Sequence, residues 1–126
     1  MTYDPLQAPD PQEWLAMDEA ERIMAIERYH KRERIRLPNL VLHASIHVVV
    51  ENQVAMGDQY EAAAVLRRLM DEGLDRHEAV HAIGSVVAAE IFEGLKHPPE
   101  SGSLAASYLT KLRQITAAKW RSMETK

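Results

Sequence analysis

The sequence predicts an all-α protein, a compact bundle of about five helices that run mostly up and down. Apolar residues recur at intervals near 3.6 over most of the chain, which is the period of one helix face. Acidic capping residues and prolines stand where these stretches begin, and glycines stand where they end. We find no confident strand pattern, in which apolar and polar residues would alternate.

The length and composition favour one helical domain over residues 1–126. The chain has no cysteine, so any metal must be held by nitrogen and oxygen ligands. There is neither a secretion signal nor an apolar run of membrane-spanning length, so we expect a cytoplasmic protein without a membrane partner. The net charge of −4 gives no general attraction to nucleic acid.

The first helix is predicted to begin at Pro11. Residues 1–9 contain two prolines and few apolar side chains, so they predict a loose leader. Asp10 then offers an N-cap, Pro11 suits the first helical position, and Glu13 completes a capping box. The apolar pattern continues until a basic stretch before Pro38.

The second helix is predicted to run from Asn39 to Gly57. The run Val48–Val50 favours a strand on propensity alone. The stretch is nevertheless long, has no internal glycine or proline, and carries its polar residues four apart, so we predict a helix. Because it is apolar almost all round, it should be central and buried.

Two further helices follow, each opened by an aspartate with a glutamate three residues later. The third is predicted from Asp58 to Gly73, and the fourth from Asp75 to Lys96, where His97-Pro98-Pro99 stops it. A Ser-Gly-Ser joint at 101–103 precedes the last helix, which is predicted within 103–126 and can lie at the periphery.

Four of the six histidines form two pairs at helical spacing. His43 and His47 lie on the second predicted helix, with Glu51 one turn further, and His77 and His81 lie on the fourth. Two imidazoles four residues apart share one helix face and can close on a single divalent ion. In an up-and-down bundle these two helices run parallel, so we expect the pairs to meet at similar heights.

The pairs predict a divalent transition-metal site, with zinc as the first choice and iron or nickel next. Buried imidazoles need partners, and metal ligation supplies them; hydrogen bonds within the core are the alternative. His30 can reach the same level as an additional ligand or as a hydrogen-bonding partner of one. Glu51 can also bridge two ions. The predicted ligands are His43, His47, Glu51, His77 and His81.

An alternative function is that of a zinc-dependent hydrolase or peptidase. The stretch His77-Glu78-x-x-His81 matches a motif in which both histidines bind zinc and the glutamate activates water, which makes Glu78 the candidate catalytic residue. The longer form of the motif requires a histidine where this chain has Val87. Glu78 is also explained as the capping-box partner of Asp75.

A second alternative needs no metal, namely a protein-interaction or homodimerisation module. Large side chains outside the histidine pairs would then form the partner surface: Met56, Met70, Met123, Trp14 and Trp120. The histidines would be hydrogen-bonded core residues. Metal content after purification without a histidine tag separates the two hypotheses.

The sequence His43-x-x-x-His47-x-x-x-Glu51-Asn52-Gln53 and the stretch 73–84 around His77 and His81 resemble a family of small uncharacterised bacterial proteins, domain of unknown function 1841. The likeness spans residues 14–96. It implies an all-α protein whose site is formed by His43, His47, Glu51, His77 and His81. No activity comes with the resemblance.

Overall fold

The computed structural model describes residues 2–35, 39–96 and 103–124, and within them it is all-helical, as predicted. The stops predicted at Pro38, at His97-Pro98-Pro99 and at Ser101-Gly102 lie outside the described residues. None of the described helices is both long and apolar enough to span a membrane. The helices are α1 (Pro11–Ala16), α2 (Glu19–Arg32), α3 (Leu40–Ala55), the 3₁₀ helix η1 (Gly57–Gln59), α4 (Ala62–Asp71), α5 (Arg76–Lys96), α6 (Ser103–Gln114) and α7 (Ala117–Glu124).

Two of the five predicted helices are each broken into two, so the predicted count was too low. The first breaks at Met17, whose backbone is extended, because Asp18 forms a reciprocal capping box with Glu21 and starts α2. The last breaks after Gln114, where the Thr116 hydroxyl accepts a hydrogen bond from the backbone N–H of Lys119. Both breaks come from side chains that cap a helix N-terminus.

The predicted N-caps Asp10 and Asp75 are confirmed, Asn39 also caps the helix that it was predicted to open, and the predicted N-cap Asp58 is wrong. Asp10, Asn39 and Asp75 each accept a backbone N–H three residues ahead, at 2.8 to 3.0 Å. Asp58 instead lies within η1, and α4 begins at Ala62 without a side-chain cap. Glu61, its predicted partner, pairs with Arg113 at 2.7 Å. A long-range ion pair therefore takes the place of the local capping box.

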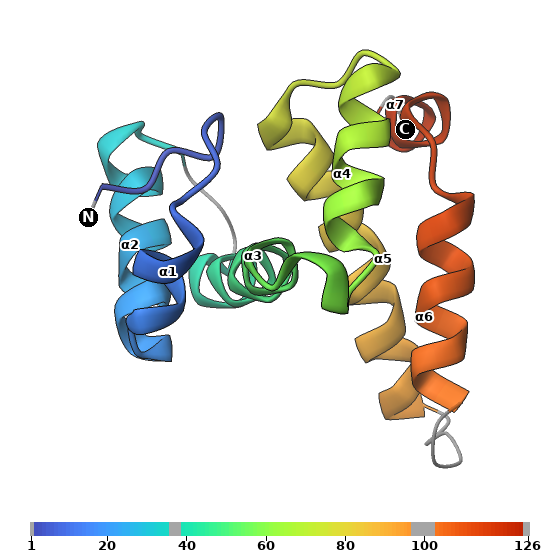
Figure 1. Cartoon of the computed structure of the whole chain (residues 1–126), viewed down its shortest axis with the longest axis horizontal. Helices are drawn as coiled ribbons and strands as arrows, with labels where there is room; N and C mark the ends of the chain where they lie inside the picture. Colours follow the sequence, from blue (N-terminus) through green and yellow to red (C-terminus); the bar gives the residue numbers. More distant parts are fainter. Residues whose placement is uncertain (1, 36–38, 97–102, 125–126) are drawn as a thin grey trace.

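Helix α3 is the central element and crosses its neighbours. Figure 1 shows α3 end-on, with α1 and α2 on one side and α4, α5 and α6 on the other, all drawn more nearly side-on. The predicted up-and-down arrangement is therefore wrong for α3. The reason is that α3 is apolar almost all round and packs against both groups of helices.

Two apolar clusters flank α3. Ala44 and Val48 pack into the cluster of α1 and α2, which contains Trp14 and Ile26. Val50 packs into the larger cluster of α4, α5, α6 and α7. Gly84 of α5 allows the close approach to α3, since a Cβ there would lie 3.1 Å from Ile46 Cγ2. The face of α5 that carries small residues therefore packs against α3.

The leader is held in place at Tyr3 and Pro5, which are buried, so the prediction of a loose segment was wrong at these two residues. Tyr3 is 1% exposed, and its ring lies 5.8 Å from that of Trp14. Two arginines from distant helices hold its backbone, because Arg32 donates to the Tyr3 carbonyl and Arg76 donates to the Pro5 carbonyl, each at 3.0 Å. No local pattern in residues 1–9 shows these contacts.

Candidate metal centre

Five histidines from three helices form one cluster. His30 comes from α2, His43 and His47 from α3, and His77 and His81 from α5. The ring centroids of His47 and His81 lie 4.8 Å apart, and those of His43 and His81 lie 5.0 Å apart. The two pairs lie together, as predicted. The reason differs from the predicted one, because α3 and α5 cross instead of running parallel.

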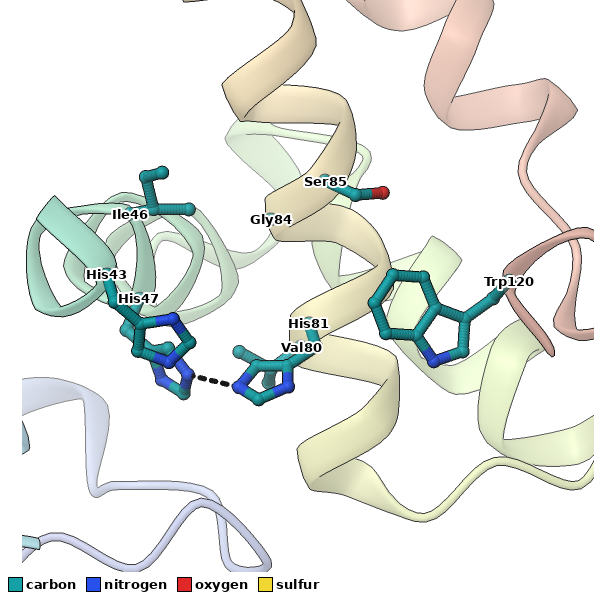
Figure 2. Close-up of a pocket in the computed structure, with 8 residues that line it drawn as sticks. All are labelled: His43, Ile46, His47, Val80, His81, Gly84, Ser85 and Trp120. Atoms are coloured by element: carbon teal, nitrogen blue, oxygen red, sulfur yellow. Dashed lines mark hydrogen bonds between the residues drawn. The ribbon is translucent and has the colours of Figure 1, made fainter. Parts of the chain in front are cut away.

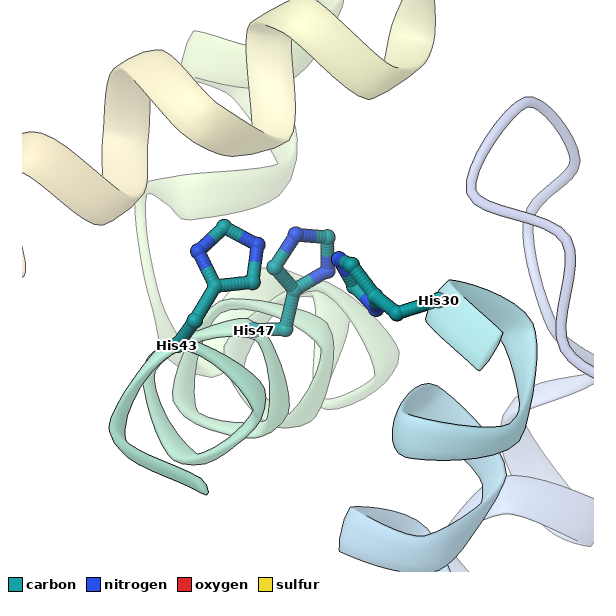
Figure 3. A group of neighbouring side chains, drawn as sticks. All are labelled: His30, His43 and His47. Carbon is teal, nitrogen blue, oxygen red and sulfur yellow. The ribbon is translucent and has the colours of Figure 1, made fainter. Parts of the chain in front are cut away.

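The cluster contains two groups of three, which share His47. The α2 triad is His30, His43 and His47, and Figure 3 shows it at the point where α2 approaches α3. The α5 triad is His47, His77 and His81. In each triad one ligand nitrogen per residue lies within 4.8 Å of the others. Either triad therefore offers three nitrogen donors to one ion.

Two of these nitrogens have no hydrogen-bond partner among the described residues. His43 Nε2 and His77 Nε2 are buried and accept or donate no hydrogen bond among the described residues. His30 Nδ1 lies 2.8 Å from the Ile26 carbonyl, which only accepts, so Nδ1 carries the proton and Nε2 keeps its lone pair. A buried polar atom without a partner costs about 1–3 kcal/mol. The cluster therefore holds buried imidazole nitrogens that the described residues leave without a partner.

Tyr3 orients the shared His47 through the ring nitrogen Nδ1, on the side away from His81. The Tyr3 hydroxyl donates to Glu51 Oε2 at 2.5 Å, so its oxygen accepts the proton of His47 Nδ1, 3.3 Å away. This leaves the lone pair of His47 on Nε2. His81 Nε2 lies 2.8 Å from it and donates to it, as the dashed line in Figure 2 marks. His47 Nε2 thus faces the centre of the cluster.

Glu51 is fixed by a buried ion pair. Arg76 donates to both of its oxygens, at 2.7 and 2.9 Å, and Glu51 and Arg76 are 1% and 5% exposed. With the bond from Tyr3, both oxygens already have donors. The predicted ligand Glu51 therefore lies at the back of the site in this structure, and its ligand role stays a prediction.

Burial favours the neutral form of four imidazoles of the cluster. Burial first, and then the neighbouring histidines, lower the pKa of His43 to about 4 and that of His81 to about 3. The pKa values of His47 and His77 are also lowered, chiefly by burial. Burial and the charge of Glu51 raise the pKa of Tyr3, so the phenol keeps its proton. Neutral imidazoles are the form that binds metal.

The nitrogen positions need only small shifts to hold an ion. Two nitrogens bound to a tetrahedral zinc at about 2.0–2.1 Å stand about 3.3 Å apart. His47 Nε2 and His81 Nε2, now 2.8 Å apart, would separate slightly, and the other donors, which lie within 4.8 Å, would close in. Side-chain rotation, together with a shift of the His81 proton from Nε2 to Nδ1, would allow both, so the donor set fits a metal ion.

A cavity of about 240 Å³ adjoins the α5 triad. In Figure 2 the imidazoles of His43, His47 and His81 gather on one side of the view and Trp120 lies on the other. Glu78 is half-buried and is not among the residues lining this cavity, and its backbone N–H donates to Asp75 at 2.8 Å. The catalytic role of Glu78 stays a prediction.

Sequence reasoning missed two residues of the site, Tyr3 and Arg76. A cationic partner for Glu51 could have been predicted from the sequence, since a carboxylate on a buried helix requires one. Its identity could not, because the partner lies 25 residues away. Tyr3 was obscured by the polar, proline-containing segment around it.

Of the side chains expected to form a partner surface, Trp14 is fully buried, so it cannot take that role. The three methionines, Met56, Met70 and Met123, are exposed. The homodimer and the absence of a nucleic-acid partner stay predictions, as does the cytoplasmic location.

Comparison of the chain with protein-family models, with curated proteins and with solved structures gives no match in any of the three. The resemblance to domain of unknown function 1841 therefore stays a prediction.

Proposed function

We propose that this protein binds a divalent transition-metal ion through its histidine cluster, with zinc as the first choice and iron or nickel next. The observation that carries the proposal is the convergence of five imidazoles around buried nitrogens without protein partners, His43 Nε2 and His77 Nε2. Hydrogen bonding alone would leave these atoms unsatisfied, whereas an ion would use them.

The α5 triad is the proposed primary ligand set, and His43 is the nearest additional donor. Its ring centroid lies 4.7 Å from that of His47 and 5.0 Å from that of His81. We assign Tyr3 and Glu51 to orienting His47, because a ligating histidine characteristically donates its other ring N–H to an oxygen. Arg76 in turn holds the Glu51 carboxylate in position.

The test is elemental analysis of untagged protein, both native and with His47→Ala and His81→Ala combined. We expect near-stoichiometric metal in the native protein and loss of it in the double variant. His81→Gln is the matched control for structure, since its amide can still hydrogen-bond to His47 but is a poor metal ligand. Folded native protein that contains no metal and binds no added zinc would overturn the proposal.

A further inference from the structure

The cavity beside the α5 triad differs sharply between its two sides. One side carries the imidazoles of His43, His47 and His81. The other lining residues have mostly apolar surface, namely Ile46, Val80 and Trp120, together with Gly84 and Ser85, and the Trp120 Nε1 donor is buried without a partner among the described residues. No carboxylate or cation is among the described residues lining the cavity. A molecule in this cavity would therefore meet the metal site at one end and a mostly apolar wall elsewhere.

The charge of the proposed site is not balanced by its own ligands. Neutral imidazoles leave both charges of a divalent ion uncompensated. The buried carboxylate behind His47 does not compensate them, because Glu51 is paired with Arg76 and the two together carry no net charge. Asp4, Asp75 and Glu78 act electrostatically on His77, but they do not line the cavity. An anion entering from the cavity would supply the missing negative charge.

The cavity also limits the size and character of that anion. Its volume of about 240 Å³ is below the usual range of about 300–1,000 Å³ for pockets that bind drug-sized ligands. We propose that the cavity binds a small organic acid, whose carboxylate completes the coordination of the ion and whose short apolar chain packs between Val80 and Trp120. This inference rests on the proposed metal site.

The test uses cobalt(II), whose visible spectrum reports on its ligands. The full chain is loaded with cobalt, its stoichiometry is measured, and butyrate is added at constant ionic strength, with chloride as the control anion. We expect a saturable spectral change with butyrate, tighter than with acetate because more apolar surface is buried. Cobalt bound with no response to either acid would overturn the cavity inference and leave the metal site standing. Failure to bind cobalt at all would overturn both.

A pair of matched variants locates the acid in the cavity. Ser85→Leu fills the cavity without removing a histidine, whereas Ser45→Leu makes the same change on α3, at a residue that does not line it. Both serines hydrogen-bond only to the backbone of their own helix in the contacts described. We expect Ser85→Leu to keep cobalt but weaken butyrate binding at least about tenfold, and Ser45→Leu to change neither. Equal butyrate affinity in the two variants would contradict the assignment.

If Ser85→Leu fails to fold, Trp120→Ala serves as the second variant. It enlarges the cavity, so the preferred acid should shift to a longer chain. An unchanged preference among acetate, butyrate and hexanoate would overturn the inference.

Discussion

The two sides of the histidine cluster differ in burial and in how firmly they are held. On the α2 side, His30 is 1% exposed and its Nδ1 is tied to the Ile26 carbonyl. On the α5 side, His77 and His81 are half-buried, and His81 faces a cavity. His47 belongs to both sides and is backed by Tyr3, Glu51 and Arg76. We infer that the α2 side forms a fixed wall of the cluster, that Tyr3 and Glu51 position His47, and that the α5 side admits the ion.

The largest effect should come from removing the ion pair that supports the shared histidine. Arg76→Leu leaves the carboxylate of Glu51 buried and unpaired, which should lower the free energy of unfolding by about 3–5 kcal/mol. Arg113→Leu is the matched control, because its pair with Glu61 is exposed and screened by solvent and should contribute little to stability. Urea unfolding of both variants measures the difference. Equal losses would show that the buried pair has no special importance.

The two sides can then be compared directly through their histidines. His81→Gln removes a donor from the α5 triad and should reduce zinc affinity more than His30→Gln, which removes one from the α2 triad. The expected reason is that the α5 triad is the primary ligand set. Competition with a zinc-chelating dye measures both affinities. A larger loss in His30→Gln would reverse the assignment and place the ion on the α2 side.

Tyr3→Phe tests the support behind His47 without altering a ligand. It removes the hydroxyl that accepts from His47 Nδ1 and donates to Glu51. Loss of such an outer contact should weaken metal binding by about 10–100-fold. Tyr60→Phe, at an exposed tyrosine, should leave the affinity unchanged. Zinc affinity that is the same in both variants would rule out an orienting function for Tyr3.

A smaller effect is expected from pH on protein stripped of metal by a chelator. The lowered pKa values of His43, about 4, and His81, about 3, mean that the unfolded chain takes up protons below about pH 6.5 while the folded chain does not. Stability should therefore fall as the pH drops from about 6.5 towards 4. Urea midpoints across this range measure the fall. The variant with both His43→Gln and His81→Gln should show a flatter profile, and a profile as steep as that of the native chain would contradict this origin.

The residues that were predicted correctly are those identified by a pattern among near neighbours in the sequence. The spacing of His43 and His47 and of His77 and His81 defines one face of a helix, so their side-by-side placement followed from helical geometry alone. The helical state of Val48–Val50 also followed, because burial on both sides of α3 outweighs the strand propensity of valine. The break at Asp18 was missed although its capping box is local, because the apolar period continues across it.

The parts that could not be predicted depend on contacts between distant segments. The crossing of α3 and α5 depends on Gly84 fitting against Ile46, and one sequence does not reveal which residues will be opposed. The orienting network joins Tyr3, Glu51 and Arg76 across 25 to 48 positions of sequence. A polar leader and a helix-terminal arginine carry no local sign that they will be buried.

The most direct test of the metal site is a crystal structure of zinc-soaked, untagged protein, with anomalous diffraction recorded at the zinc edge. The account predicts one strong peak between α3 and α5, at about 2.0–2.1 Å from the Nε2 atoms of His47 and His81. A structure with the histidine rings placed as described here and no peak among them would contradict it.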